Sequence, residues 1–142
     1  MASATLIGMT LETTGHCLCG RVKYRVTGVP NWRCLCHCES CRRATGVPVT
    51  AFASFPVAHF HFEGETSRYQ SSAGVTRTFC GHCGTPLTYA SEDLPGEIHL
   101  LTGSADHPEA AHLTPQWHTF DNERISWVDL GAGLPRSKPK PA

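Results

Sequence analysis

The chain has 142 residues, and its 12 lysines and arginines are balanced by 12 aspartates and glutamates, so its formal net charge is zero. This balance argues against a nucleic-acid-binding protein that works through a broad basic surface, and the length suits one domain with its own core. We therefore expect no nucleic-acid partner. No run of about 18 apolar residues occurs, so we expect no membrane partner either.

The chain contains eight cysteines, and their chemistry depends on the redox compartment. Residues 1–14 lack the basic segment and following apolar segment that mark a secretory signal. We therefore expect a cytoplasmic protein, whose cysteines stay reduced and bind metal rather than form disulfides. The nine histidines are scattered, and no two have the i, i+4 spacing that clamps a metal from one helix face.

Short strands separated by turns dominate the pattern. After a flexible N-terminus over residues 1–14, residues 20–26 alternate apolar and charged side chains, which predicts a half-buried strand. Further short strands are predicted over residues 47–55, 57–62, 66–70, 75–79, 86–89 and 97–101, with Gly, Pro, Ser or Asn between them. Only residues 40–45 and 108–112 are expected to form a helical turn.

This pattern predicts a single zinc-binding β domain over residues 15–130, with an irregular, sandwich-like form. From residue 131 the composition changes to a segment with three prolines, two lysines and no apolar periodicity. We expect this tail, residues 131–142, to be disordered.

Two outer cysteine pairs lie far apart in the sequence and share one local pattern. Cys17 and Cys19 are followed at once by Gly20, and Cys80 and Cys83 by a glycine at position 84. A glycine there permits a left-handed backbone and leaves room for amide groups to point at the sulfurs. A structural zinc ion takes four tetrahedral ligands, commonly as two such pairs, and closing a long loop stabilises a fold. We expect these four sulfurs to form a closed structural site.

The middle of the chain carries four cysteines within eight residues, at positions 34, 36, 38 and 41. On a straight strand Cys34 and Cys38 would lie about 13 Å apart, too far for one ion with bonds of about 2.3 Å. Cys36, Cys38 and Cys41 can converge at a bend, which leaves Cys34 as a small buried hydrophobe. Three protein ligands and an open fourth position are typical of a catalytic zinc. Four sulfurs this close in sequence could also close a second structural site.

Three segments carry a resemblance to a known family. They are Cys17-Leu18-Cys19-Gly20-x-Val22-x-Tyr24, then Cys36-His37-Cys38-x-x-Cys41-Arg42-Arg43-x-x-Gly46, and Phe79-Cys80-x-x-Cys83-Gly84-Thr85-x-Leu87. With these motifs the chain resembles the glutathione-dependent formaldehyde-activating enzyme family, which shares a domain with centromere protein V. The resemblance covers about residues 15–135.

The resemblance implies an all-β fold of the β-tent type, a small zinc-binding fold as in the zinc-binding chaperones of small GTPases, with several short antiparallel strands. It also implies two zinc ions as cofactors, one structural and one labile, with glutathione as a further cofactor. The implied metal ligands are Cys17, Cys19, Cys80 and Cys83 for the structural ion, and Cys36, Cys38 and Cys41 for the labile ion. Cys34 lies at a position that varies in the family, where it could supply a fourth ligand.

The family's named reaction joins glutathione to formaldehyde. We therefore expect a carbon–sulfur lyase-type enzyme, similar to S-hydroxymethylglutathione synthase, whose partners are a small-molecule thiol and an aldehyde. Thiolate ligands weaken the Lewis acidity of zinc, which favours activation of the thiol over polarisation of the aldehyde. The carboxylates of glutathione would suit Arg42, Arg43 or Arg77, and His118 occupies a family-like position for a proton carrier.

Two other functions fit the same cysteines. The first is a non-catalytic, zinc-stapled module of the same fold that binds another protein, for which two equally resistant zinc ions are expected. The second is a methionine sulfoxide reductase on a similar fold. That enzyme would need a nucleophilic cysteine outside the zinc sites, and only Cys34 could supply it.

Overall fold

The computed structural model describes residues 11–140, so the predictions for residues 1–10 and for the last two residues of the tail lie outside the described residues. Ten strands and one α-helix, α1 (Glu39–Thr45), form this part of the chain. The strands are β1 (Glu12–His16), β2 (Lys23–Thr27), β3 (Trp32–Cys36), β4 (Thr50–Pro56), β5 (Phe60–Glu63), β6 (Ser67–Ser72), β7 (Val75–Phe79), β8 (Pro86–Ser91), β9 (Glu97–Leu101) and β10 (Trp117–Thr119). The prediction of a β-rich domain is confirmed.

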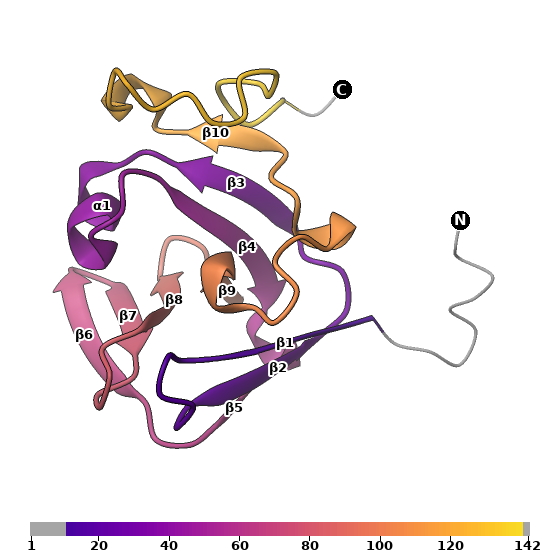
Figure 1. Cartoon of the computed structure of the whole chain (residues 1–142), viewed down its shortest axis with the longest axis vertical. Helices are drawn as coiled ribbons and strands as arrows, with labels where there is room; N and C mark the ends of the chain where they lie inside the picture. The colour runs from indigo at the N-terminus through magenta and orange to yellow at the C-terminus, as the bar shows by residue number, and fades with distance from the viewer. Residues whose placement is uncertain (1–10, 141–142) are drawn as a thin grey trace.

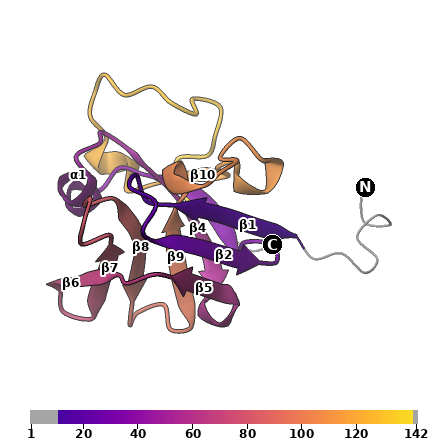
Figure 2. The same cartoon turned by 60° about the horizontal axis from the view of Figure 1, so that its bottom comes forward.

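The strands form two sheets, which Figure 1 and Figure 2 show from two sides. A three-stranded sheet has the order β1-β2-β5, and a seven-stranded sheet has the order β10-β3-β4-β9-β8-β7-β6. All pairs of neighbouring strands are antiparallel except β10 and β3, which run parallel. No helix within residues 11–140 has the length and apolar character needed to cross a membrane.

The seven-stranded sheet has an apolar cluster on each face, because successive strand residues point to opposite sides. On β9, Leu100 belongs to the cluster shared with the three-stranded sheet, whereas Leu101 belongs to the second cluster. The first cluster includes Val22, Tyr24, Val26, Phe55, Phe60 and Leu87. The second includes Cys34, Cys36, Cys41, Phe52 and Trp117, with Trp32 and Tyr89 packed against it. The middle cysteines therefore lie on the face away from the three-stranded sheet.

Most of the predicted elements form, with shifted boundaries. Residues 75–79 and 97–101 are strands over the predicted range, and the helical turn at 40–45 lies within α1. The strand predicted to start at residue 20 begins only at Lys23, because the chain first turns around the cysteines at 17 and 19. Residues 57–59 form a 3₁₀ turn before β5 rather than the first part of the strand predicted over 57–62. Another 3₁₀ turn spans Ala111–Leu113, where a helical turn was predicted over 108–112.

Both ends of the described chain make contacts with the rest of the domain. Residues 12–14, predicted to be flexible, are part of β1, where Thr13 is buried. In the tail, the carbonyl of Pro135 accepts a hydrogen bond from the backbone N–H of His118 at 2.8 Å, and Arg136 forms an ion pair with Asp121 at 3.1 Å. These polar contacts join residues 135 and 136 to β10 and to the turn that follows it.

Candidate metal centres

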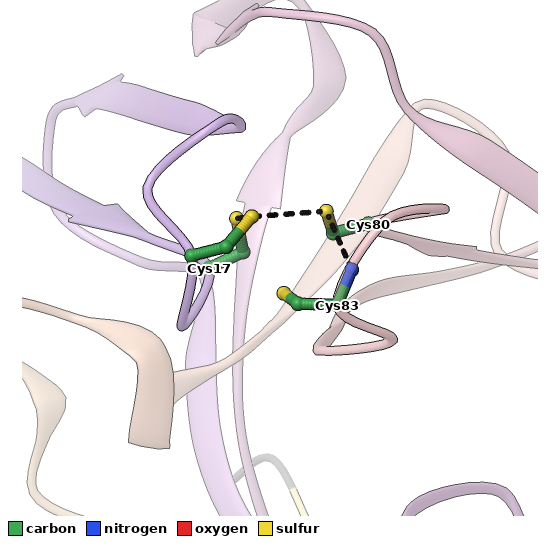
Figure 3. A group of neighbouring side chains, drawn as sticks. Cys17, Cys80 and Cys83 are labelled. Carbon is green, nitrogen blue, oxygen red and sulfur yellow. Dashed lines mark hydrogen bonds between the residues drawn. The ribbon is translucent and has the colours of Figure 1, made fainter.

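The four outer cysteines come together from two turns. Cys17 and Cys19 lie between β1 and β2, and Cys80 and Cys83 lie between β7 and β8. The four sulfurs lie within 4.8 Å of one another, with 3.6 Å between Cys17 and Cys19 and 3.8 Å between Cys19 and Cys80. Two zinc–sulfur bonds of about 2.3 Å at the tetrahedral angle place neighbouring sulfurs about 3.8 Å apart. The spacing therefore fits one tetrahedral ion, and Figure 3 shows the sulfurs of Cys17, Cys80 and Cys83 facing one another. We call these four residues the first cysteine group.

Backbone amides point at the sulfurs of the first cysteine group. The N–H of Cys83 donates to the sulfur of Cys80 at 3.4 Å, and that of Val22 donates to the sulfur of Cys17 at 3.3 Å. Each turn closes through a glycine in the left-handed region, Gly20 and Gly84, both with φ of 82°. Such donors stabilise thiolates, which are the form that binds metal.

Thr85 links the two turns of the first cysteine group. Its hydroxyl lies 3.2 Å from the sulfur of Cys83 and accepts a hydrogen bond from the backbone N–H of Leu18 at 3.0 Å. The side-chain and backbone hydrogen bonds of Thr85 lower the pKa of Cys83 to about 5. One residue therefore both joins the turns and favours the ligating form of a cysteine.

Three of the four middle cysteines form a second group around the start of α1. Cys36 ends β3, Cys38 is the N-cap of α1 and Cys41 lies in its first turn, and their sulfurs lie within 4.8 Å of one another. The N–H of Cys41 donates to the sulfur of Cys38 at 3.3 Å. This is the contact that Cys83 makes to Cys80, so both C-x-x-C segments use one local geometry. We call Cys36, Cys38 and Cys41 the second cysteine group.

Cys34 lies outside the second cysteine group. It is on β3 two residues before Cys36, in the same apolar cluster, and its side chain is 2% exposed. Burial, together with the nearby Cys41 and Cys38, raises its pKa to about 12. A protonated, buried thiol matches the predicted role of a small hydrophobe, and it is a poor nucleophile.

The thiols of the second cysteine group differ in pKa, and the arginines nearby differ in whether they contact the sulfurs. Hydrogen bonds with Cys36 and Cys41 lower the pKa of Cys38, whereas hydrogen bonds with Cys38 and Cys41 raise the pKa of Cys36. Both terminal nitrogens of Arg77 lie 3.9 Å from the sulfur of Cys41. Arg43 instead forms an ion pair with Glu39 at 2.7 Å, one turn away on α1. From the sequence alone, Arg77 is a candidate only for binding a carboxylate.

A family model for glutathione-dependent formaldehyde-activating enzyme matches residues 12–123, which contain both cysteine groups. The chain belongs to this family. A Schizosaccharomyces pombe protein named as an uncharacterized lyase is 34% identical over 80 residues, which cover 56% of this chain. The aligned part spans 58% of the length of that relative.

The fold of this family member also resembles a solved structure. A crystal structure of a Rhodobacter sphaeroides protein matches with a TM-score of 0.56 and 22% identity, over 66% of this chain and 87% of that chain. At this identity the match shows a shared fold and nothing more. It supports the β-rich architecture that the sequence predicts.

A buried pair of histidines lies next to the second cysteine group. His37 and His118 are fully buried, and Nε2 of His37 lies 2.8 Å from Nδ1 of His118. Nε2 of His118 donates to the carbonyl of Gly131 at 2.8 Å. Both ring nitrogens of His118 therefore have protein partners, which does not support the predicted role as proton carrier. Asp121 lies close enough to the two histidines for the three to form a possible metal site. Asp121 already forms ion pairs with two arginines, however, and their positive charges disfavour a metal cation at this position.

The histidine pair could not be found from spacing, because its members are 81 residues apart. The parallel pairing of β3 with β10, which sets Leu35 beside His118, brings them together. The backbone N–H of His37 also donates to the carbonyl of Thr119 at 3.0 Å. The loop that carries Cys36 and Cys38 is thus attached to β10 by both backbone and side-chain hydrogen bonds.

Proposed function

We propose that the chain is a zinc-dependent lyase-type enzyme that joins a thiol, such as glutathione, to a small aldehyde, such as formaldehyde. The second cysteine group carries this proposal, because three converging sulfurs leave one position of a tetrahedral ion for a substrate. Membership of the formaldehyde-activating family and the relative named as a lyase support the reaction class. The first cysteine group is proposed to hold a structural ion with four protein ligands.

The residues of the second cysteine group fit a zinc ion that exchanges one ligand. Their sulfurs converge from β3 and the start of α1, and Cys38 is partly exposed whereas Cys36 and Cys41 are buried. When bound, zinc would supply a positive centre that favours the thiolate form of an incoming thiol. The chain's part is to hold the three sulfurs in a fixed bend, through the N-cap contact of Cys38 and the strand pairing of β3.

The proposed reaction forms one carbon–sulfur bond. The substrate sulfur attacks the carbonyl carbon of the aldehyde, and the π electrons of the carbonyl move to its oxygen. The proton lost by the thiol ends on that oxygen, which gives an S-hydroxymethyl adduct without an oxidant or reductant. No imidazole of the buried pair is needed for this transfer, which is consistent with solvent acting as the proton carrier.

The test compares Cys41→Ala with Cys34→Ala. NMR exchange spectroscopy measures adduct formation from glutathione and formaldehyde on protein whose zinc content has been counted. We expect the wild type and C34A to accelerate the reaction above the uncatalysed rate, and C41A to lose both the acceleration and one zinc ion. Because both substitutions remove a buried sulfur, C34A controls for a general loss of packing.

Two results would contradict the proposed function. Unchanged zinc content and acceleration in C41A would remove the second cysteine group from the reaction. No acceleration by the wild type with any thiol and aldehyde pair, at two zinc ions per chain, would favour the non-catalytic protein-binding module.

A further inference from the structure

Arg77 lies on β7, and its guanidinium group is held from three sides. Its Nε donates to the hydroxyl of Ser71 on β6 at 3.1 Å, and its guanidinium carbon lies 5.1 Å from the ring centroid of Tyr89 on β8. Both terminal nitrogens then reach the sulfur of Cys41 at 3.9 Å. A planar, permanently charged group fixed in this way is already oriented toward the sulfur.

The position of Arg77 follows from the strand register. Arg77 pairs with Tyr69 on β6 and with Tyr89 on β8, so it stands in the middle of a three-strand row. In Figure 1 the end of β6 and the neighbouring β7 lie beside α1, which carries Cys41. The contact thus joins the helix of the second cysteine group to a strand 36 residues further along the chain.

We propose that Arg77 is the cationic partner of the second cysteine group, which lets this group retain its metal ion and accept an additional anionic ligand. The proposal rests on the metal-binding part of the proposed function and not on the reaction. Three thiolates around a divalent ion leave a net charge of about −1, and an incoming thiolate makes it about −2. The charge of Arg77 offsets one unit in a partly buried place, where an uncompensated charge is costly.

The first cysteine group is built differently. Within residues 11–140, its sulfurs receive hydrogen bonds from backbone N–H groups and the Thr85 hydroxyl, and none from an Arg or Lys side chain. A four-sulfur site has no position for a substrate and needs no allowance for an added charge. The arginine is thus found at the group that has the open position.

This placement also changes the predicted role of Arg77. Nε faces Ser71 and both terminal nitrogens face Cys41, so three of the five N–H donors of Arg77 are engaged within the chain. The proposal therefore assigns Arg77 a positioning and charge-compensating role at the metal group in place of the predicted role in binding the carboxylates of glutathione. Removal of Arg77 should affect a neutral thiol as much as glutathione.

The experiment uses Arg77→Gln, Arg77→Lys and the matched control Arg68→Gln. Arg68 carries the same charge on the adjacent strand β6, but it pairs with Thr78, so its side chain lies on the opposite face of the sheet. One measurement follows zinc release to a chelator. A second loads the protein with Co²⁺ and follows the thiolate-to-cobalt absorption during titration with 2-mercaptoethanol or glutathione.

We expect R77Q to release one of its two zinc ions about tenfold faster than the wild type, the loss that follows when a charged hydrogen-bond donor is removed. The other ion should leave at the wild-type rate, which also shows that the variant is folded. R77Q should bind both thiols more weakly and by a similar factor. R77K should lie between R77Q and the wild type, and R68Q should match the wild type.

Wild-type release rates and thiol affinities in R77Q would overturn the inference. A loss of affinity for glutathione alone, with 2-mercaptoethanol unaffected, would overturn it in favour of carboxylate binding. These results are separable from a failure of the proposed function. A wild type that forms no adduct but shows the expected R77Q effect on metal release keeps the inference and removes the reaction.

Discussion

His99 on β9 is buried among aromatic side chains near the second cysteine group, and this burial changes its pKa. Its ring centroid lies 4.6 Å from that of Trp32, 5.4 Å from that of Tyr89 and 6.3 Å from that of Phe52. Burial lowers the pKa of His99, and its contact with Glu97 at 3.1 Å opposes this effect only in part. Burial therefore disfavours the protonated form of His99 in the folded protein.

The lowered pKa of His99 predicts a loss of stability in acid. Below about pH 6.5 the unfolded chain takes up a proton at His99 more readily than the folded chain does. The free energy of unfolding therefore falls as the pH drops from 7 toward the folded pKa. We expect His99→Gln to lose less stability than the wild type between pH 7 and pH 5, measured by urea unfolding in excess zinc.

The control for this prediction is His107→Gln, since the side chain of His107 is 81% exposed and is not part of the aromatic cluster around His99. H107Q should lose as much stability in acid as the wild type. An equal or larger loss in H99Q would show that the burial of His99 does not contribute to the acid sensitivity.

Which single residues could be found from the sequence depended on how local their contacts are. The spacings C-x-C and C-x-x-C identify seven cysteines, which the structure brings together in two groups. These spacings are informative because cysteines one or two residues apart lie on the same turn. The contact of Arg77 with Cys41 and the pair of His37 with His118 were missed, because both depend on how distant strands pair. Strand geometry favoured a position of Cys34 outside the group, but it left a fourth-ligand role open.

At the scale of elements, the first cysteine group lies on turns of the two sheets. The turn with Cys17 and Cys19 joins β1 to β2, and these two strands approach each other closely. Gly15 pairs with Tyr24, whose hydroxyl lies 2.9 Å from that of Ser104. A Cβ at position 15 would overlap the Tyr24 ring hydroxyl and the backbone carbonyl of Ser104. The sequence did not predict β1, because its Thr-Thr-Gly-His segment has no apolar alternation to mark a strand.

This close approach predicts that Gly15→Ala is strongly destabilising. We expect a loss of about 1–3 kcal/mol in the free energy of unfolding, since neither the Tyr24 ring nor the carbonyl can move without breaking other contacts. The matched control is Gly103→Ala, where a Cβ meets no atom within 4 Å; a change within about 0.5 kcal/mol is expected there. Urea unfolding measures both, and equal effects would contradict the packing of β1 on Tyr24.

At the scale of the whole molecule, the seven-stranded sheet separates two different environments. One face packs against the three-stranded sheet, and the first cysteine group joins the turns of both sheets beside that core. The other face carries the second cysteine group and the aromatic cluster. The pattern of short strands predicted one β domain, but it could not indicate which cysteines lie on which face, since that depends on strand order.

This division predicts that removing the two groups has different consequences. A ligand lost from the first group opens a link between residues far apart in the sequence, so Cys80→Ala should lower the thermal unfolding temperature by about 10 °C or more. The three ligands of the second group all lie on one short segment, so losing one of them opens no long-range link. Cys41→Ala should therefore change the thermal unfolding temperature much less.

Native mass spectrometry of the zinc-loaded protein during exposure to a chelator tests this division most directly. The wild type should carry two zinc ions and lose one of them much faster than the other. C41A should carry only the slowly released ion, and C80A should lack it. Two ions released at the same rate from the wild type, or two ions retained by C41A, would contradict the assignment of one closed and one open metal centre.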